Sequence, residues 1–211
     1  MSKEFIDTLK VLIDKKDSVL LQESLSKLHP ADIAEVCSEL DIEEARFLYR
    51  QLDNEKAADA LIEMDEDLRN ELLEELPSEA IAKRFVNYMD SDDAVEIIRD
   101  MDEDKQEEIL AHIEDIEQAG DIVDLLKYDE DTAGGIMGTE MVIVNENWSM
   151  PDCLREMRLQ AEDRDEIYNV YVVDDEERLQ GTFPLKKMIT NPSVSKVKHV
   201  MDKDLISIHV D

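Results

Sequence analysis

The stretch LDIEEARFLYRQLDNEKAADALIEMDED, residues 40–67, decides the fold of the first half of the chain. A leucine or methionine followed by aspartate occurs in it three times, at Leu40, Leu52 and Met64, at intervals of twelve residues. Aspartate suits the N-cap of a helix, where its carboxylate accepts a hydrogen bond from a free backbone N–H. Between these positions the apolar residues follow helical spacing. The stretch therefore predicts consecutive short helices.

The same unit continues in both directions along the chain. Its opening apolar residues are Leu28, Leu40, Leu52, Met64, Leu76, Met89 and Met101, and every interval is twelve except the thirteen between Leu76 and Met89. We expect helix breaks near residues 29, 41, 53, 65, 77, 90 and 102. The predicted N-cap carboxylates are Asp41, Asp53, Asp65, Asp90 and Asp102, and Pro30 and Pro77 stand at two further helix starts.

The pattern also predicts how these helices pack. Ala34, Ala58 and Ala82 recur every 24 residues, which indicates that two helices form one repeat and approach closely at the alanines. Helices of about nine residues are not stable alone, so they must stack on their neighbours. We predict a right-handed-type α-superhelix of short helices over 1–127, with no β-strand in residues 1–126.

The charge of the chain narrows its possible partners. The formal net charge is −32 at pH 7, and residues 1–127 carry 37 acidic and 14 basic residues. Such a chain is repelled by nucleic acid and by anionic membrane surfaces, and it attracts cations or a basic partner. No uncharged run exceeds eight residues and no apolar signal core is present, so we expect a cytosolic polypeptide.

The second half changes to a mixed α and β pattern after an acidic, glycine-rich joint over 128–140. We expect a strand at 141–144, a helix at 149–160 capped by Ser149, a β-hairpin at 167–183, and a helix that ends before Pro192. A further strand is expected to begin within 200–211. The fold class is therefore multidomain, α and α+β.

This order resembles a CBS (cystathionine β-synthase-type) module over 141–199, with a truncated second module over 200–211. A helical superhelix, an acidic joint and CBS modules together resemble the cytosolic region of the MgtE-type magnesium transporters. The joint matches that family's pattern at Tyr128, Ala133, Gly134, Gly135 and Met137. The family usually has threonine–proline–glutamate where this chain has Gly138, Thr139 and Glu140.

The resemblance implies a regulatory function. The chain would be the Mg²⁺-sensing, gating part of a magnesium transporter, in which Mg²⁺ between the acidic N-domain and the CBS surface favours the closed state. Asp92 and Glu96 lie four residues apart, on one helix face, and Mg²⁺ prefers oxygen ligands. The resemblance maps the family's Mg²⁺-binding acids onto Asp92 and Glu96, with Asp93 adjacent. The alternative is that Asp92 only stabilises the first turn of its helix.

The resemblance also bears on nucleotide binding. CBS modules often carry a Gly-x-φ-Ser/Thr-x-x-Asp run whose acid binds a ribose. Here that run begins at Gly181, the hydroxyl position is Pro184 and the acid position is Lys187. The sequence therefore argues against ATP binding by this part of the chain, and we predict no nucleotide-binding residues.

Other functions remain as alternatives. One is a CBS-containing scaffold or adenine-nucleotide sensor whose helical repeat binds a protein partner. A Mg²⁺-dependent phosphohydrolase ranks third, because no catalytic motif occurs, and we expect no enzyme activity. The expected partners are Mg²⁺, a second copy of the chain through the CBS modules, and the transmembrane domain of the intact protein at the cytoplasmic face of the membrane.

Overall fold

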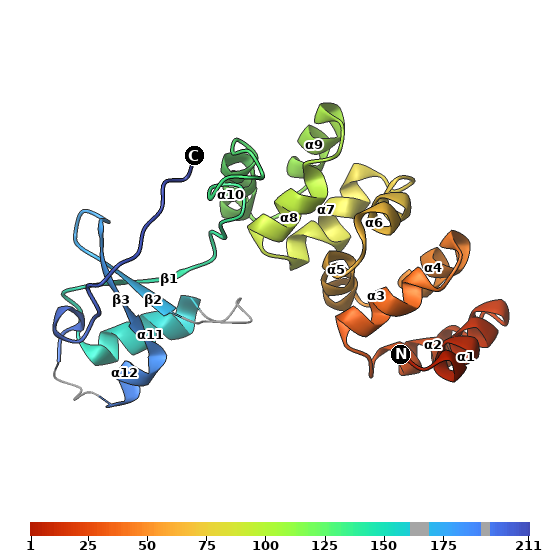
Figure 1. The fold of residues 1–211 in the computed structure, drawn as a ribbon, viewed down its shortest axis with the longest axis horizontal. Coiled ribbons are helices and arrows are strands. Elements are labelled where there is room, and N and C mark those ends of the chain that lie inside the picture. Colours follow the sequence, from red (N-terminus) through yellow and green to blue (C-terminus); the bar gives the residue numbers. More distant parts are fainter. Residues whose placement is uncertain (161–168, 191–194) are drawn as a thin grey trace. The chain divides into compact units, whose positions relative to one another are not determined.

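The computed structural model of the chain describes residues 1–160, 169–190 and 195–211 (Figure 1). These residues form two compact units, Met1–Asp129 and Glu130–Asp211. We call them the helical unit and the α/β unit.

The helical unit consists of short helices joined by tight turns, and the part of it that the structure describes holds no β-strand. Its elements are α1 (Lys3–Asp14), α2 (Ser18–Leu25), α3 (Pro30–Ser38), α4 (Ile42–Tyr49), α5 (Asn54–Ile62), α6 (Glu66–Leu73), α7 (Ser78–Arg84), the 3₁₀ turn η1 (Val86–Tyr88), α8 (Ser91–Ile98), α9 (Glu103–Leu110) and α10 (Ile116–Leu125). The predicted helix breaks are confirmed, because each falls on the residue directly before a helix.

The predicted caps are confirmed in position and only partly in bonding. Asp41 accepts from Glu44 N at 2.9 Å while the Glu44 side chain accepts from Asp41 N, which is a capping box. Asp53 accepts from Lys56 N at 2.9 Å. Three other predicted caps stand at N-cap positions, but their side chains form no cap hydrogen bond: Asp65, Asp90 and Asp102. These three aspartates are exposed, as are Asp41 and Asp53, so exposure does not distinguish the caps that form the bond from those that do not.

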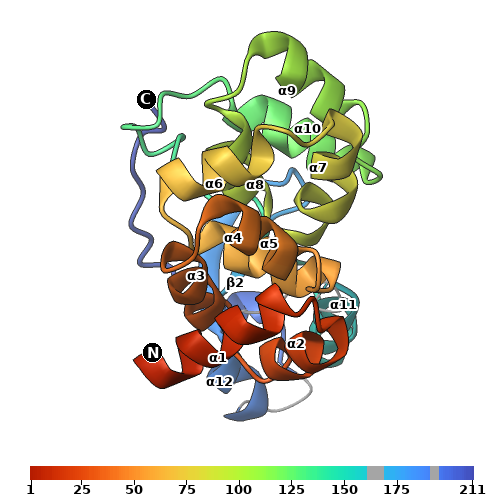
Figure 2. The same ribbon diagram turned by 90° about the vertical axis from the view of Figure 1, so that its right-hand side faces the viewer.

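Helices two apart in the sequence pack on each other, as the 24-residue period predicts. Contacts join α3 to α5, α5 to α7, α7 to α9, α4 to α6 and α8 to α10 (Figure 2). Ala34, Ala58 and Ala82 are all buried, and they lie on α3, α5 and α7, which contact one another in that order. The thirteen-residue interval between Leu76 and Met89 coincides with η1, so the extra residue is taken up by a 3₁₀ turn.

The α/β unit has a three-stranded sheet of order β1–β2–β3. Strand β1 (Val142–Asn145) runs parallel to β2 (Asn169–Val173), and β2 pairs antiparallel with β3 (Leu179–Pro184). Helix α11 (Met150–Gln160) packs on β1, and α12 (Leu185–Thr190) follows β3 (Figure 1). The core of the unit contains Val142, Val144, Met150, Cys153, Met157, Val170, Val172, Phe183 and Val197.

The end of the chain differs from the expectation. After the 3₁₀ turn η2 (Val197–His199), residues 203–211 form no strand, and Ile206 and Ile208 are exposed. Among the described residues no strand lies beside this segment to share a ladder of hydrogen bonds, and a strand without a partner is not stable in water. The expected start of the hairpin at 167–168 and the expected helix stop at Pro192 lie outside the described residues.

Candidate metal site on helix α8

Helix α8 has one buried face and one acidic face. Ala94, Val95, Ile97 and Ile98 are buried against neighbouring helices, because they recur at helical spacing. The three predicted ligands occupy the other positions of the helix and reach solvent to different degrees. Asp92 and Asp93 are half-buried, and Glu96 is exposed.

Glu96 forms an ion pair that the sequence did not predict. Its Oε1 accepts from Nη1 of Arg69, on α6, at 2.8 Å. The Arg69 side chain is 5% exposed and that of Glu96 is 62% exposed, so the pair joins a buried cation to a surface carboxylate. Within the described part of the chain, Nε of Arg69 has no hydrogen-bond partner. Glu96 is therefore the counter-charge of a buried guanidinium, and this bond occupies one of its two oxygens.

Asp92 and Asp93 lie in the first turn of α8. Carboxylates are favoured there by the positive end of the helix dipole, by about 0.3–1 kcal/mol each. The same dipole weakens the attraction of this first turn for a cation. Asp92 and Asp93 are half-buried and Glu96 is exposed, and carboxylate oxygens are the ligands that Mg²⁺ prefers while it retains several of its own waters. The donor set fits a weakly held Mg²⁺.

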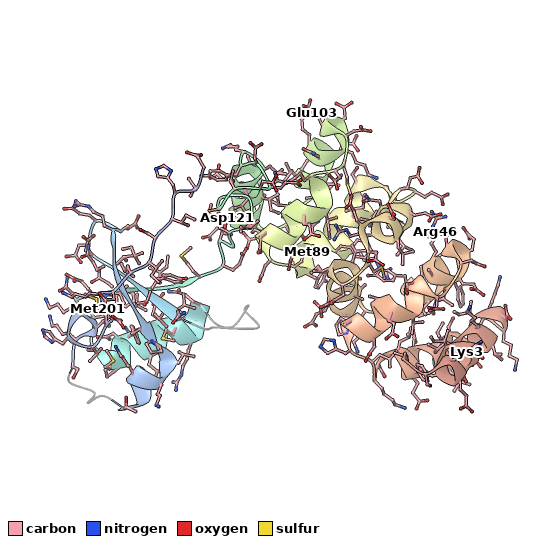
Figure 3. All side chains as sticks on the ribbon, viewed as in Figure 1. Lys3, Arg46, Met89, Glu103, Asp121 and Met201 are labelled. Carbon is pink, nitrogen blue, oxygen red and sulfur yellow. The ribbon has the colours of Figure 1, made fainter. Side chains whose placement is uncertain are left out.

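The basic side chains of the helical unit are largely used inside it. Lys56 Nζ donates to the carbonyl of Ser26 at 2.9 Å, Arg84 Nη2 to that of Tyr49 at 2.7 Å, and Arg99 Nη1 to that of Tyr128 at 2.6 Å. Each of these carbonyls belongs to the last residue of a helix or to a residue just after one. A basic side chain from another element therefore donates to a carbonyl that has no partner within its own helix. Carboxylates consequently dominate the surface of the unit (Figure 3). This surface attracts cations.

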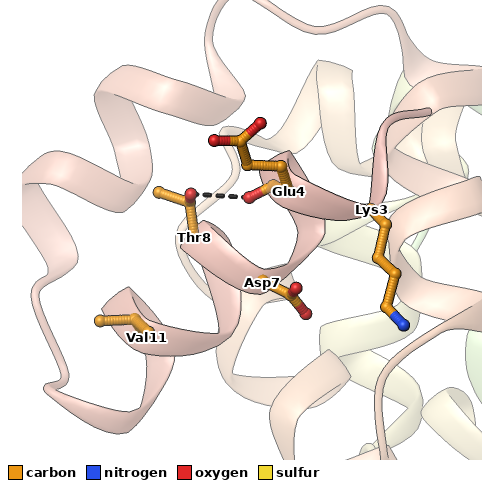
Figure 4. Close-up of a pocket in the computed structure, with 5 residues that line it drawn as sticks. All are labelled: Lys3, Glu4, Asp7, Thr8 and Val11. Atoms are coloured by element: carbon orange, nitrogen blue, oxygen red, sulfur yellow. Dashed lines mark hydrogen bonds between the residues drawn. The ribbon is translucent and has the colours of Figure 1, made fainter.

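A depression on the surface of α1 is a second candidate for a cation site, and a poorer one than α8. It is lined by Lys3, Glu4, Asp7, Thr8 and Val11 (Figure 4). The Thr8 hydroxyl donates to the carbonyl of Glu4 at 2.8 Å, which is a bond within one helix turn. The position of Lys3 among the two carboxylates makes this a poorer cation site than α8.

In the α/β unit, Gly181 is required by packing. A Cβ at this position would lie 2.5 Å from the backbone oxygen of Asp202. Thr182 and Asp202 exchange backbone hydrogen bonds here, with Thr182 N to Asp202 O at 3.0 Å. Pro184 is exposed, and Lys187 lies on α12. Gly181 is therefore required for a structural reason, and the residue at position 187 is basic rather than acidic.

None of the helices in the described ranges is long and apolar enough to cross a bilayer. The fold is that of a helical-repeat domain joined to a CBS-type α/β module. The family model of the MgtE intracellular N domain matches residues 28–131, and that of the CBS domain matches residues 133–192. The chain belongs to the MgtE family and corresponds to its cytosolic part.

Two relatives carry the name magnesium transporter MgtE. The protein from Enterococcus faecalis is 37% identical over 94 residues, which are 44% of this chain and 21% of that protein. The protein from Thermus thermophilus is 28% identical over 212 residues, which cover 100% of this chain and 47% of that protein. The chain thus spans about half, or less, of the length of these relatives. They are transporters by name, in agreement with the prediction that the chain is not an enzyme.

Two solved structures resemble the chain along its length. The soluble part of a magnesium transporter has a TM-score of 0.82 and 28% identity, covering 99% of this chain and 81% of that one. The cytosolic domain of the Mg²⁺ channel MgtE in complex with ATP has a TM-score of 0.87 and 27% identity, covering 98% and 84%. These likenesses agree with the predicted order of a helical domain and a CBS module.

Proposed function

We propose that this chain is the Mg²⁺-sensing regulatory part of a magnesium transporter, with Asp92, Asp93 and Glu96 as Mg²⁺ ligands. The observation that supports the proposal is the set of three carboxylates on α8, in a unit whose residues 1–127 carry 37 acidic and 14 basic side chains. The membership of the MgtE family supplies the ion, because the named relatives are magnesium transporters.

The mechanism that we propose is electrostatic. Both parts of the chain are acidic, and residues 128–211 carry 18 acidic and 9 basic residues. Like charges repel over a range of about 8 Å at physiological salt. Mg²⁺ bound to the carboxylates of α8 reduces this repulsion and stabilises a more compact state. In an intact transporter we infer that the compact state is the closed one and that loss of Mg²⁺ shifts the population away from it.

The binding step is tested by calorimetric titration of the intact chain with MgCl₂ at constant ionic strength. The test variant is Asp92→Asn with Glu96→Gln, in which the amide oxygen introduced at position 96 can still accept from Arg69. The matched control is Asp67→Asn with Glu71→Gln, which changes an exposed acidic pair at the same two positions of α6. We expect the α8 variant to lose most of the Mg²⁺ heat and the α6 variant to keep it. Equal loss in both variants would reduce the effect to general surface charge.

We propose that strand β3 and helix α12 of this chain do not form an ATP-binding site, although one similar solved structure is in complex with ATP. The support is the chemistry of the run after Gly181, in which Pro184 offers no hydroxyl and Lys187 no carboxylate. Equilibrium dialysis with labelled ATP tests this point. Retention of ATP that depends on Gly181–Lys187 would contradict it.

We further propose that the chain self-associates through its α/β unit, over 141–199, with residues 200–211 as the beginning of a second module. Several exposed apolar side chains of the unit support this proposal: Ile143, Leu154, Leu159 and Leu179. Exposed apolar surface of this kind is typical of association. Sedimentation equilibrium from micromolar to millimolar chain should show weak dimers. A monomer throughout that range would argue against the proposal.

A further inference from the structure

A partly enclosed pocket of about 270 Å³ lies within the helical unit, between α4, α6 and the end of α7. Its apolar lining includes the buried side chains of Leu61, Leu72, Leu73 and Phe85 and the half-buried Leu76. Its polar lining includes three arginines, Arg46, Arg50 and Arg84, and one carboxylate, Glu75. Residues 1–127 hold only 14 basic residues against 37 acidic ones, so three guanidinium groups at one pocket are a local reversal of the charge of the unit.

Arg46, labelled in Figure 3, shows how a carboxylate is held at this pocket. Its Nη1 lies 3.0 Å from an oxygen of Glu43 and 3.2 Å from one of Glu75, and its Nη2 donates to the carbonyl of Glu71 at 2.9 Å. The Arg46 side chain is mostly buried, while Glu75 is exposed. Both terminal nitrogens of this arginine therefore have partners within the protein, whereas its buried Nε has none among the described residues.

Arg50 and Arg84 retain free donors. Arg50 donates through Nε to the carbonyl of Arg46 at 3.2 Å, and in the described ranges its Nη1 and Nη2 have no partner. Arg84 donates through Nη2 to Tyr49 O and Leu52 O, and its guanidinium lies 5.8 Å from the centre of the Phe85 ring. Its Nε and Nη1 likewise have no partner among the described residues. Two guanidinium edges are therefore available beside an apolar surface.

We propose that this pocket binds a small organic acid with one branched or aromatic apolar group. The apolar group contacts the buried leucines and Phe85, and the carboxylate accepts the free N–H groups of Arg50 and Arg84. Paired N–H donors in a fixed planar fork match the two oxygens of a carboxylate, and such bonds are stronger than neutral ones. The volume lies just below the ~300–1,000 Å³ of sites for drug-sized ligands, which suits a ligand with a single apolar group.

The experiment uses calorimetric titration of the intact chain with two probe acids, phenylacetate and 4-methylpentanoate. Phenylacetamide keeps the apolar group without the charge, and acetate keeps the charge without the apolar group. We expect both probe acids to bind, and phenylacetamide and acetate to bind at least tenfold more weakly. Binding of phenylacetamide or of acetate equal to that of the probe acids would overturn the proposal, as would the absence of binding by both acids.

Variants locate the binding. Arg50 is exposed at the C-cap of α4, so Arg50→Gln should leave the fold intact and weaken both acids at least tenfold. Arg50→Lys keeps the charge without the fork and should give an intermediate affinity. Lys27→Gln, an exposed site outside the pocket, removes the same charge and should have no effect. Unchanged affinity in Arg50→Gln would overturn the proposal. An acidic, apolar peptide that binds while neither acid does would assign the pocket to a protein partner and overturn it as well.

Discussion

The Glu96 carboxylate has a structural role in addition to the proposed metal role, because it neutralises the buried Arg69. We predict that Glu96→Ala lowers the free energy of unfolding of the helical unit by about 1–3 kcal/mol, the range for leaving a charged hydrogen-bond partner unsatisfied. Glu96→Gln should cost less, because an amide oxygen can still accept from Arg69. Urea denaturation in EDTA measures both without any contribution from Mg²⁺. If alanine and glutamine give the same stability as glutamate, the ion pair does not stabilise the unit.

The two cysteines allow a prediction about how the stability of the chain depends on pH. Both thiols are buried, and burial raises the pKa of Cys37 and of Cys153 to about 12. Because this value is higher in the folded chain than in the unfolded one, the thiol contribution to stability is complete below about pH 9 and is lost as the pH rises towards 12. A thiol-reactive dye at pH 8 should therefore label neither cysteine until urea unfolds the chain. Rapid labelling of the folded chain would contradict the burial of these side chains.

Two glycines in regular elements should respond to alanine with opposite signs. Gly181→Ala places a Cβ against the backbone oxygen of Asp202, which cannot move aside as a flexible side chain can. We expect a loss of about 1–3 kcal/mol, as for other overpacked sites. Gly120 lies within α10 with nothing within 4 Å of an added Cβ, so Gly120→Ala should stabilise that helix by up to about 1 kcal/mol. Thermal unfolding of the two variants measures both effects. A loss of stability in both would show that the space around α10 is not free.

The elements that the sequence predicted are those that depend on local signals. An N-cap such as Asp41 and the apolar residue before it act within one turn, so the helix starts could be predicted to the residue. The absence of a cap bond at Asp65 and Asp102 could not, because the residue type and its exposure are the same as at Asp41 and Asp53, where the bond forms. The prediction of a strand after residue 200 was wrong. A strand is stable only beside another strand, and the local sequence pattern does not show whether such a neighbour is present.

The candidate site shows the same division between local and long-range information. The four-residue spacing of Asp92 and Glu96 predicts a shared helix face. The pairing of Glu96 with Arg69, 27 residues away, depends on how α6 packs beside α8, and no local pattern reports it. The excess of acidic over basic residues in 1–127 favours a carboxylate partner for a buried arginine on numbers alone, but it does not identify Glu96 as that partner.

At the scale of the whole molecule, the central claim is that Mg²⁺ acts through specific carboxylates rather than by screening. General screening depends on ionic strength and is nearly independent of which salt provides it. Specific binding at α8 depends on the divalent ion and on the identity of residues 92 and 96. The two mechanisms therefore separate when salts are compared at equal ionic strength.

The most direct measurement is small-angle X-ray scattering of the intact chain in millimolar MgCl₂ and in NaCl of matched ionic strength. We predict that the radius of gyration falls in Mg²⁺ and not in Na⁺. The fall should disappear in the variant Asp92→Asn with Glu96→Gln and should remain in the α6 control variant. An equal fall in both salts, or a Mg²⁺-specific fall that persists in the α8 variant, would contradict the assignment of Mg²⁺ sensing to these carboxylates.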